Sequence, residues 1–183
     1  MKEFDSVRGA SGLPGDRSRS VADGKWRASN RLVSDYVSVN RQRLSEAIRL
    51  AWSIRDRLTA LYPIMADLCR STCPWCPEPC CIVNRVWFDF RDVLFFHMTA
   101  VPLPPGPLGS DQREACRYLT PRGCALSQLQ RPWGCTQYVC ATQRRFLAKS
   151  GGQVAMERLD SEIQGIAAAR IAMEETVARV VDR

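Results

Sequence analysis

The chain has one histidine, little lysine and no long apolar run free of proline. His97 is the only histidine, and three of the 26 basic residues are lysine. The longest stretch without charge, 93–110, contains four prolines, which break helices, so we expect a loop and no membrane span. The N-terminus lacks the apolar segment of a secretory signal. These absences predict a cytoplasmic protein, and 183 residues with 45% hydrophobic and 25% charged content fit one soluble domain.

The charge pattern argues against a nucleic-acid partner. The net charge is +7, but the arginines are scattered, and their longest run is Arg144-Arg145. A nucleic-acid binder usually concentrates its charge in a run or on one face. The sequence also shows no paired carboxylates, no nucleophile with a base and no glycine-rich phosphate loop. An independent enzyme is therefore the weakest function class, although enzymatic activity stays open.

The N-terminal part predicts a flexible leader followed by a long helix. Residues 1–29 are rich in Gly, Ser, Asp and Arg, which suits a flexible leader. Apolar residues then recur at steps of four and three, which predicts one face of a helix over about 30–61. Pro63 predicts that this helix ends or kinks, within a helical segment of 30–68.

The C-terminal part, 142–183, has the same apolar spacing and predicts the fold class. A Gly151-Gly152 break separates a helix of about 153–181 from a shorter one that starts near residue 136. The two long helices satisfy both apolar stripes by packing antiparallel, or alternatively by packing on a common core. We expect a mainly α fold: a long antiparallel helical hairpin, capped at one end by an irregular, loop-rich cysteine cluster. Residues 30–183 then form a single domain.

A short helix is predicted between the two long ones, from Asp89 to Met98. Asp89 is a plausible N-cap, because its carboxylate can accept hydrogen bonds from the first free N–H groups of the helix. His97 lies in an apolar run of this segment. We therefore expect a partly buried histidine with a hydrogen-bond partner rather than a metal ligand.

The cysteines carry the strongest chemical signal. Eight of the nine lie within 73–140, in a region that we bound at 69–141, and crowded thiols in an unexported protein indicate a metal site more often than disulfides. The first group reads C-x2-C-x3-C-C, a spacing typical of metal ligands. Cys69 is expected to be a small buried side chain outside the ligand set. The predicted ligands, which should converge at one end of the fold, are Cys73, Cys76, Cys80, Cys81, Cys116, Cys124, Cys135 and Cys140.

This pattern resembles the bacterial YkgJ-like cysteine-cluster proteins, whose domain is described as chelating zinc or iron. The resemblance covers about 69–141 and is specific in the order and spacing of its residues. The matching positions are Cys73, Cys76, Cys80 and Cys81 at the opening, and Cys116, Cys124, Arg131, Pro132, Cys135 and Cys140 at the close. It implies metal chelation by these cysteines. Some relatives are linked to lysine methylation, but this chain shows no methyl-donor motif, so that activity is not expected.

The residues around the cysteines favour an iron–sulfur or iron centre, with zinc as the alternative. Pro77 follows Cys76 and has no N–H for a sulfur, unlike the Gly of an ordinary zinc knuckle. Arg117 and Arg131 can offset thiolate charge and donate hydrogen bonds to sulfur. Tryptophans near the cysteines, Trp75, Trp87 and Trp133, could wall the site from water or simply pack. Pro132 should fix the chain before Cys135 while Arg131 turns toward the sulfurs or a carboxylate.

Two functions follow from this site. In the first, an iron–sulfur or iron centre transfers electrons or supports the cofactor of a partner. In the second, zinc folds a structural module, and the helical hairpin is a surface for protein interaction. Both predict a protein partner or a homodimer through the helices, and neither needs nucleic acid or a membrane.

Overall fold

The computed structural model describes residues 14–83, 86–108, 116–121 and 123–182, with side chains from residue 21 onward. It is mainly α, as the sequence predicts. The irregular character expected for the cysteine region is only loosely supported, because short helices and a small hairpin interrupt its loops. The elements are α1 (Pro14–Val39), α2 (Ser45–Thr72), η1 (Cys73–Trp75), α3 (Cys80–Val83), α4 (Phe90–Thr99), β1 (Leu119–Thr120), β2 (Gly123–Cys124), η2 (Gln128–Gln130), α5 (Trp133–Thr136) and α6 (Ala141–Val181).

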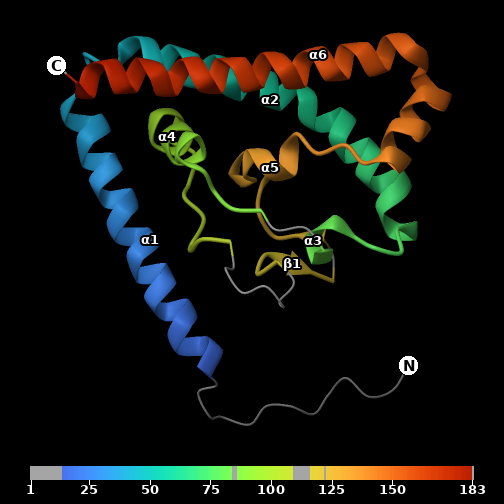
Figure 1. Ribbon diagram of the computed structural model, residues 1–183, viewed down its shortest axis with the longest axis horizontal. Coiled ribbons are helices and arrows are strands. Elements are labelled where there is room, and N and C mark those ends of the chain that lie inside the picture. Colours follow the sequence, from blue (N-terminus) through green and yellow to red (C-terminus); the bar gives the residue numbers. More distant parts are fainter. Residues whose placement is uncertain (1–13, 84–85, 109–115, 122, 183) are drawn as a thin grey trace.

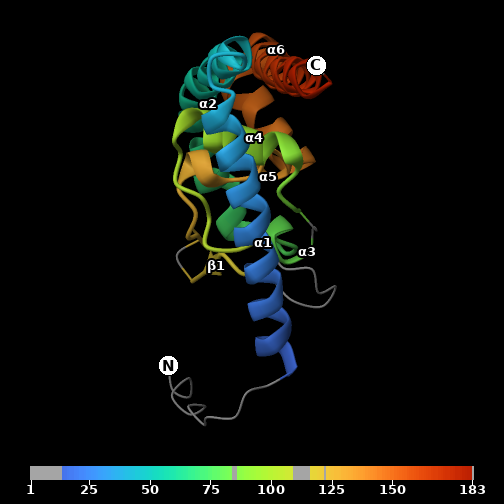
Figure 2. The same ribbon diagram turned by 90° about the vertical axis from the view of Figure 1, so that its left-hand side faces the viewer.

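The long helices α2 and α6 lie side by side and run antiparallel (Figures 1 and 2). Their predicted stripes meet in one core cluster, which confirms the hairpin. Each large side chain buried there contributes about 1.5–3 kcal/mol. The buried stripe residues are Leu44, Ala51, Leu58, Leu159, Ile166, Met173 and Val177, and the partly buried Ile48 and Ile163 pack against them. The two stripes therefore cover each other.

The predicted glycine break in the C-terminal helix is confirmed. Gly152 has φ 72° and ψ −176°, a backbone conformation that favours glycine, and it joins two helical halves within α6. The first half therefore turns away from the long second half at one end of the molecule (Figure 1). This turn brings Cys140, the residue before α6, back to the end of α2 that carries Cys69.

The predicted leader and first helix are wrong in their boundaries. α1 begins at Pro14, so the part of the leader from 14 to 29 is helical, while residues 1–13 lie outside the described residues. A turn over 40–44 then separates α1 from α2. The apolar spacing hid this turn, because Leu44 inside it stays fully buried and in step with the stripe.

Pro63 does not end the helix, although an end there is one of the two predicted outcomes; a kink is the other. α2 continues through it to Thr72. Pro63 is exposed, whereas Met65 and Leu68 beyond it are buried in the core. Burial of these two side chains, about 1.5–3 kcal/mol each, offsets the roughly 3 kcal/mol that a proline costs inside a helix.

Helix α1 runs along one side of the region below the α2–α6 layer and contacts its loops (Figures 1 and 2). The indole Nε1 of Trp26 donates to the Pro104 carbonyl at 3.0 Å, and its ring lies 5.2 Å from the Phe88 ring. One turn earlier in the same helix, the Asp23 carboxylate accepts hydrogen bonds from both terminal nitrogens of Arg117, at 2.6 and 3.1 Å. These contacts explain why 14–29 is helical: the segment has packing partners that its composition does not reveal.

A buried ion pair fixes α4, α5 and α6 relative to one another. Asp89 caps α4 as predicted, in a capping box with Asp92. Arg170 of α6 is 3% exposed and bonds Asp89 at 2.8 Å and Asp92 at 2.9 Å. Asp92 also accepts the backbone N–H of Trp133 at 3.1 Å, at the start of α5. The network therefore sets the position of the short helix that carries Cys135.

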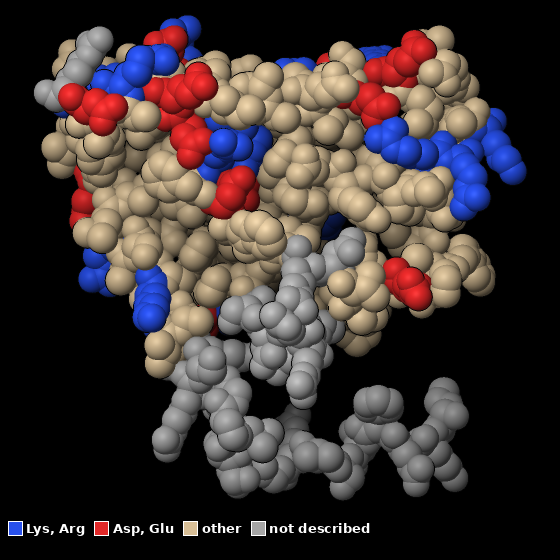
Figure 3. Space-filling model, viewed as in Figure 1, with Lys and Arg blue, Asp and Glu red and all other residues tan. Residues whose placement is uncertain are grey.

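On the face shown in Figure 3, the charged side chains of the described residues do not form one continuous basic patch. Along the α2–α6 layer in Figure 3, basic side chains are interspersed with acidic ones, and the middle of the face shown is mostly uncharged. Ion pairs such as Arg57–Glu162 and Arg91–Glu174 account for some of this alternation. Within the described residues, no helix combines the length and apolar content needed to cross a membrane.

Candidate metal centre

The nine cysteines lie in or next to α2, η1, α3, β1, β2, α5 and α6. In Figure 1 the end of α2, α3, α5 and the start of α6 all lie below the long second half of α6. All nine belong to described residues, and all are free thiols. Their contacts divide them into two groups, which we name after one member of each. The Cys81 group comprises Cys80, Cys81, Cys116, Cys124 and Cys135; the Gln143 group comprises Cys69, Cys73 and Cys140, gathered around Gln143.

The Cys81 group draws thiols from α3, β2, α5 and the loop before β1. The backbone N–H of Cys116 donates to the Cys81 carbonyl at 3.1 Å, which ties that loop to α3. The Cys81 thiol is hydrogen-bonded to Cys80 and also lies within electrostatic reach of Cys116 and Cys135. Cys135 in turn is within reach of Cys124. Residues more than fifty positions apart in sequence therefore converge.

Within this group the thiols differ in their readiness to ionise. The Cys81 side chain hydrogen-bonds Cys80, and backbone N–H groups assist, so the pKa of Cys80 falls to about 6. The same hydrogen bond, together with burial, raises the pKa of Cys81. Although Cys135 keeps surface exposed, desolvation of its thiol and the charges of Cys116 and Cys124 raise its pKa to about 12. A bound cation relieves this mutual repulsion, because its positive charge stabilises several neighbouring thiolates at the same time.

The Gln143 group joins the end of α2 to the start of α6. Gln143 Nε2 lies 3.6 Å from the Cys69 sulfur and 3.9 Å from the Cys73 sulfur. Its backbone N–H donates to the Cys140 sulfur at 3.5 Å. Cys69 and Cys73 are also hydrogen-bonded to each other, and burial followed by the Cys69 charge raises the pKa of Cys73 to about 11. Cys69, predicted to stand outside the ligand set, thus lies in direct contact with one predicted ligand.

Cys76 stands apart from both groups. It is exposed, and among the described residues its thiol makes no hydrogen bond with another sulfur. The described part of the chain also contains no three His, Cys, Asp or Glu side chains that could hold a metal ion as they stand. The thiol groups are therefore near one another without forming a closed coordination shell, and a bound ion would require their side chains to turn.

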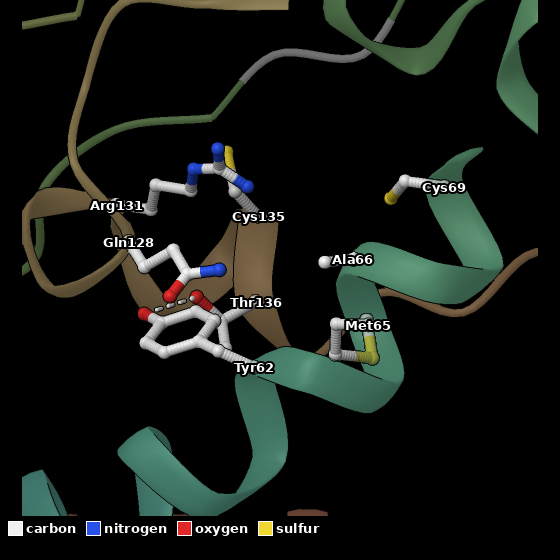
Figure 4. Close-up of a pocket in the computed structure, with 8 residues that line it drawn as sticks. All are labelled: Tyr62, Met65, Ala66, Cys69, Gln128, Arg131, Cys135 and Thr136. Atoms are coloured by element: carbon white, nitrogen blue, oxygen red, sulfur yellow. Dashed lines mark hydrogen bonds between the residues drawn. The ribbon is translucent and has the colours of Figure 1, made fainter.

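Arg131 lies beside Cys135 at a small cavity of about 30 Å³, room for one or two waters (Figure 4). Its guanidinium faces the Cys135 sulfur, and its charge lowers the pKa of that thiol. Arg131 Nε is buried and has no hydrogen-bond partner among the described residues. Pro132, nearly fully buried with φ −62°, is the N-cap of α5 and sets the approach of the chain to Cys135. A buried donor without a partner is costly, so this arginine has a hydrogen bond to give to a bound group.

The other predicted flanking residues are placed differently. Arg117 is directed to Asp23 and to the Pro107 carbonyl, and the hydrogen bonds that it donates to Asp23 raise its pKa. Trp75 is 85% exposed, so it does not wall the thiols from water, and Trp87 is exposed too. Trp133 is buried, with the Arg170 guanidinium 5.5 Å from its ring, and acts in packing. The sequence showed that these residues are near the cysteines along the chain but not where they point.

Residues that the sequence analysis did not select also take part. Gln143 was missed, although Cys140 and Gln143 have the three-residue spacing of a capping box. Cys69 and Cys73 are four residues apart, the spacing that places two side chains on one helix face. His97 has a partner, as expected, because Nε2 lies 3.1 Å from Asn30 Oδ1 and burial lowers its pKa.

Comparison with known proteins adds no identification. No protein-family model, curated protein or solved structure matches this chain. Membership of the YkgJ-like proteins therefore stays a prediction that rests on the cysteine spacing. The function has to be argued from the site itself.

Proposed function

We propose that the chain binds an iron–sulfur or iron centre through the Cys81 group and uses it to transfer electrons or to support the cofactor of a partner protein. The observation that carries the proposal is the convergence of five thiols from four separate segments. Iron–sulfur clusters are usually held by four cysteine thiolates, which this group can supply with one to spare. The YkgJ-like spacing supports the same chemistry.

Two features of the donor set fit such a centre: the adjacent thiols of Cys80 and Cys81, and the arginine beside Cys135. Cys80 and Cys81 are adjacent and hydrogen-bonded, so they can reach different iron atoms of one cluster more easily than a single ion. Arg131 supplies positive charge and an unpartnered buried Nε next to Cys135. Hydrogen bonds and charge near the sulfurs tune the potential of a cluster. When bound, the centre would supply one-electron chemistry.

The chain's own residues would orient and protect this centre. The Arg170 network holds α5, and with it Cys135, at a fixed distance from α4 and α6. The Arg117–Asp23 pair clamps the loop of Cys116 onto α1. Both positions are therefore determined by the rest of the fold before a metal arrives, which reduces the ordering that binding must supply.

A partner surface fits this proposal better beside the thiols than on the hairpin. The two apolar stripes of α2 and α6 are buried against each other. Apolar side chains near the cysteines are exposed instead: Trp75, Ile82, Val83, Trp87 and Phe90. A protein that exchanges electrons with the centre would approach it from this side.

The test is the visible absorption spectrum of the full chain purified without oxygen, before and after reduction by dithionite. We expect sulfur-to-iron absorption that bleaches on reduction, and loss of it in Cys116→Ser and Cys135→Ser. Cys76→Ser is the third variant: Cys76 is exposed and lies outside the Cys81 group, so the absorption should stay, and its loss would show that the centre uses the ligands of the C-x2-C-x3-C-C opening instead. A colourless protein that contains stoichiometric zinc would contradict the iron centre and favour the structural zinc module.

A further inference from the structure

Three of the nine cysteines surround a single glutamine at the junction of α2 and α6. Cys69 lies in the last turn of α2, Cys73 follows directly after it, and Cys140 is the N-cap of α6. Gln143 reaches all three sulfurs, two through its side-chain amide and one through its backbone N–H. The sequence predicted Cys73 and Cys140 as metal ligands and Cys69 as a residue outside the ligand set.

The orientation of Gln143 is fixed by a fourth contact. Its Oε1 accepts the backbone N–H of Cys140 at 3.1 Å, so the amide nitrogen must face the Cys69 and Cys73 sulfurs. The residue is 5% exposed, so both the oxygen and the nitrogen of its side-chain amide are used inside the protein. A buried amide that directs its N–H groups at two sulfurs is the arrangement that stabilises thiolates bound to a metal.

The two helix ends act on this junction in complementary ways. The N-cap of α6 is a cysteine, where Ser, Thr, Asp or Asn is the usual residue, and its sulfur accepts an N–H of the first turn. A helix N-terminus favours a negative group such as a thiolate, while the C-terminal carbonyls of α2 favour a positive one. The Cys140 thiolate would meet the first preference, and a cation held by the three sulfurs would meet the second.

This group makes its hydrogen bonds separately from the Cys81 group, although Cys69 and Cys135 line the same small cavity. Figure 4 shows Cys69 on α2, across the cavity from Arg131 and Cys135. Cys80 is the link between the groups, because it lies within electrostatic reach of Cys73, but this is the weakest of the effects on Cys73. The hydrogen-bond contacts of Cys73 are with Cys69, Thr72 and Gln143, none of which belongs to the Cys81 group.

We infer that Cys69, Cys73 and Cys140 form a second metal site, held by Gln143, for a single thiophilic ion of the zinc type. The inference rests on the proposed function in assuming that the chain binds metal at all. Three thiolates are one fewer than an iron–sulfur cluster usually takes, whereas Zn²⁺ accepts three protein ligands and a water. The chain would therefore carry two centres, one for each cysteine group.

The test is a titration of the metal-free, reduced full chain with Zn²⁺ in the presence of a chromogenic chelator, without oxygen. Wild type should bind two ions. At saturation, alkylation mapped by peptide mass spectrometry should find Cys69, Cys73 and Cys140 protected, along with Cys116 and Cys124. Cys69→Ser should bind one ion fewer and leave Cys73 and Cys140 open to alkylation, with Cys116 and Cys124 still protected.

The outcomes separate this inference from the proposed function. If Cys69→Ser keeps two ions, or keeps Cys73 and Cys140 protected, the second site is overturned. If wild type binds one ion that protects Cys116 but not Cys69, the second site alone is overturned. If wild type binds no zinc, the second site is overturned, while the absorption spectrum of the protein as purified still decides the iron centre. Far-UV circular dichroism on Cys69→Ser checks that the helices are intact, and serine is close enough in size to the half-buried cysteine to keep them.

A second variant tests the positioning role of Gln143. Gln143→Leu keeps a buried side chain of similar size but removes both amide contacts with the sulfurs. Loss of a partner that orients metal ligands typically weakens metal affinity by about 10- to 100-fold, and we expect that loss for one of the two ions only. Gln164→Leu is the control, since Gln164 is exposed on the same helix. Wild-type affinity for both ions in Gln143→Leu would overturn the arrangement.

Discussion

Gln143 Nε2 lies 3.6 Å from the Cys69 sulfur, although the two residues are 74 positions apart in sequence. The contact exists because Gly152 lets the first half of α6 turn back to the end of α2. The long helices thus do more than form a core: their junction brings cysteines from both ends of the cysteine region together.

Replacement of Arg131 by Gln should weaken the retention of the metal by about 10- to 100-fold or shift the cluster potential, as for other groups that hydrogen-bond metal ligands. The variant loses the charge that faces Cys135 and the buried Nε donor. Metal content after dialysis against a chelator measures the effect, and circular dichroism should show unchanged helix content. Arg145→Gln, an exposed arginine of α6, is the control. If the two variants retain the same amount of metal, Arg131 does not stabilise the metal centre and has only a structural role in the turn before Pro132.

The metal-free protein should react with iodoacetamide first at Cys80. Its pKa of about 6 makes it largely a thiolate at pH 7, while Cys73, with a pKa of about 11, stays protonated. The Cys80 rate should therefore rise with pH to a plateau above about pH 7 and fall as the pH drops through 6. Cys81→Ala removes the side-chain hydrogen bond and should move this midpoint toward 9. Peptide mass spectrometry measures both; an unmoved midpoint would contradict the assigned contact.

Replacement of Arg170 by Met should lower the free energy of unfolding by about 3–5 kcal/mol, because it leaves the buried Asp92 carboxylate without its counter-charge. Urea unfolding measures the loss. Arg91→Met is the matched control: its ion pair with Glu174 is about one-third exposed and should be worth less than about 1 kcal/mol. Similar losses in both variants would show that the Arg170 network does not hold α4, α5 and α6 together.

Two glycines with open space around them should respond to alanine in opposite directions. An added Cβ meets nothing within 4 Å at Gly24 or at Gly152. Gly24 lies inside α1, so Gly24→Ala should stabilise by about 0.5–1 kcal/mol. Gly152 has φ 72°, so Gly152→Ala should destabilise by about 1–3 kcal/mol. Thermal unfolding compares them, and a stabilised Gly152→Ala protein would rule out the sharp turn in α6.

The sequence predicted the features that depend on local chemistry. The spacing of apolar residues predicted that α2 and α6 pack together. Asp89 predicted the start of α4, and the glycine pair predicted the break in α6. It failed where packing across the molecule outweighs local preference. Pro63 stays in a helix because its neighbours are buried, and α1 starts early because of contacts with Phe88 and Arg117.

The candidate site follows the same division. Spacing identified the cysteines, and the Arg131-Pro132 pair indicated a charged group next to Cys135. It could not reveal that Arg117 turns to Asp23 or that Trp75 faces water, since both depend on the path of the loops. The place of Cys69 was missed for a related reason: its partner Gln143 comes from the other end of the cysteine region.

The most direct test of the central claim, that the thiols of this chain bind metal, is the amount of iron, zinc and acid-labile sulfide per chain in protein purified without oxygen. The account predicts iron with sulfide, lost in Cys116→Ser, together with zinc, lost in Cys69→Ser. It also predicts that most of the nine thiols are unreactive until the metals are removed. A chain that contains neither iron nor zinc, with all nine thiols reactive as purified, would contradict it.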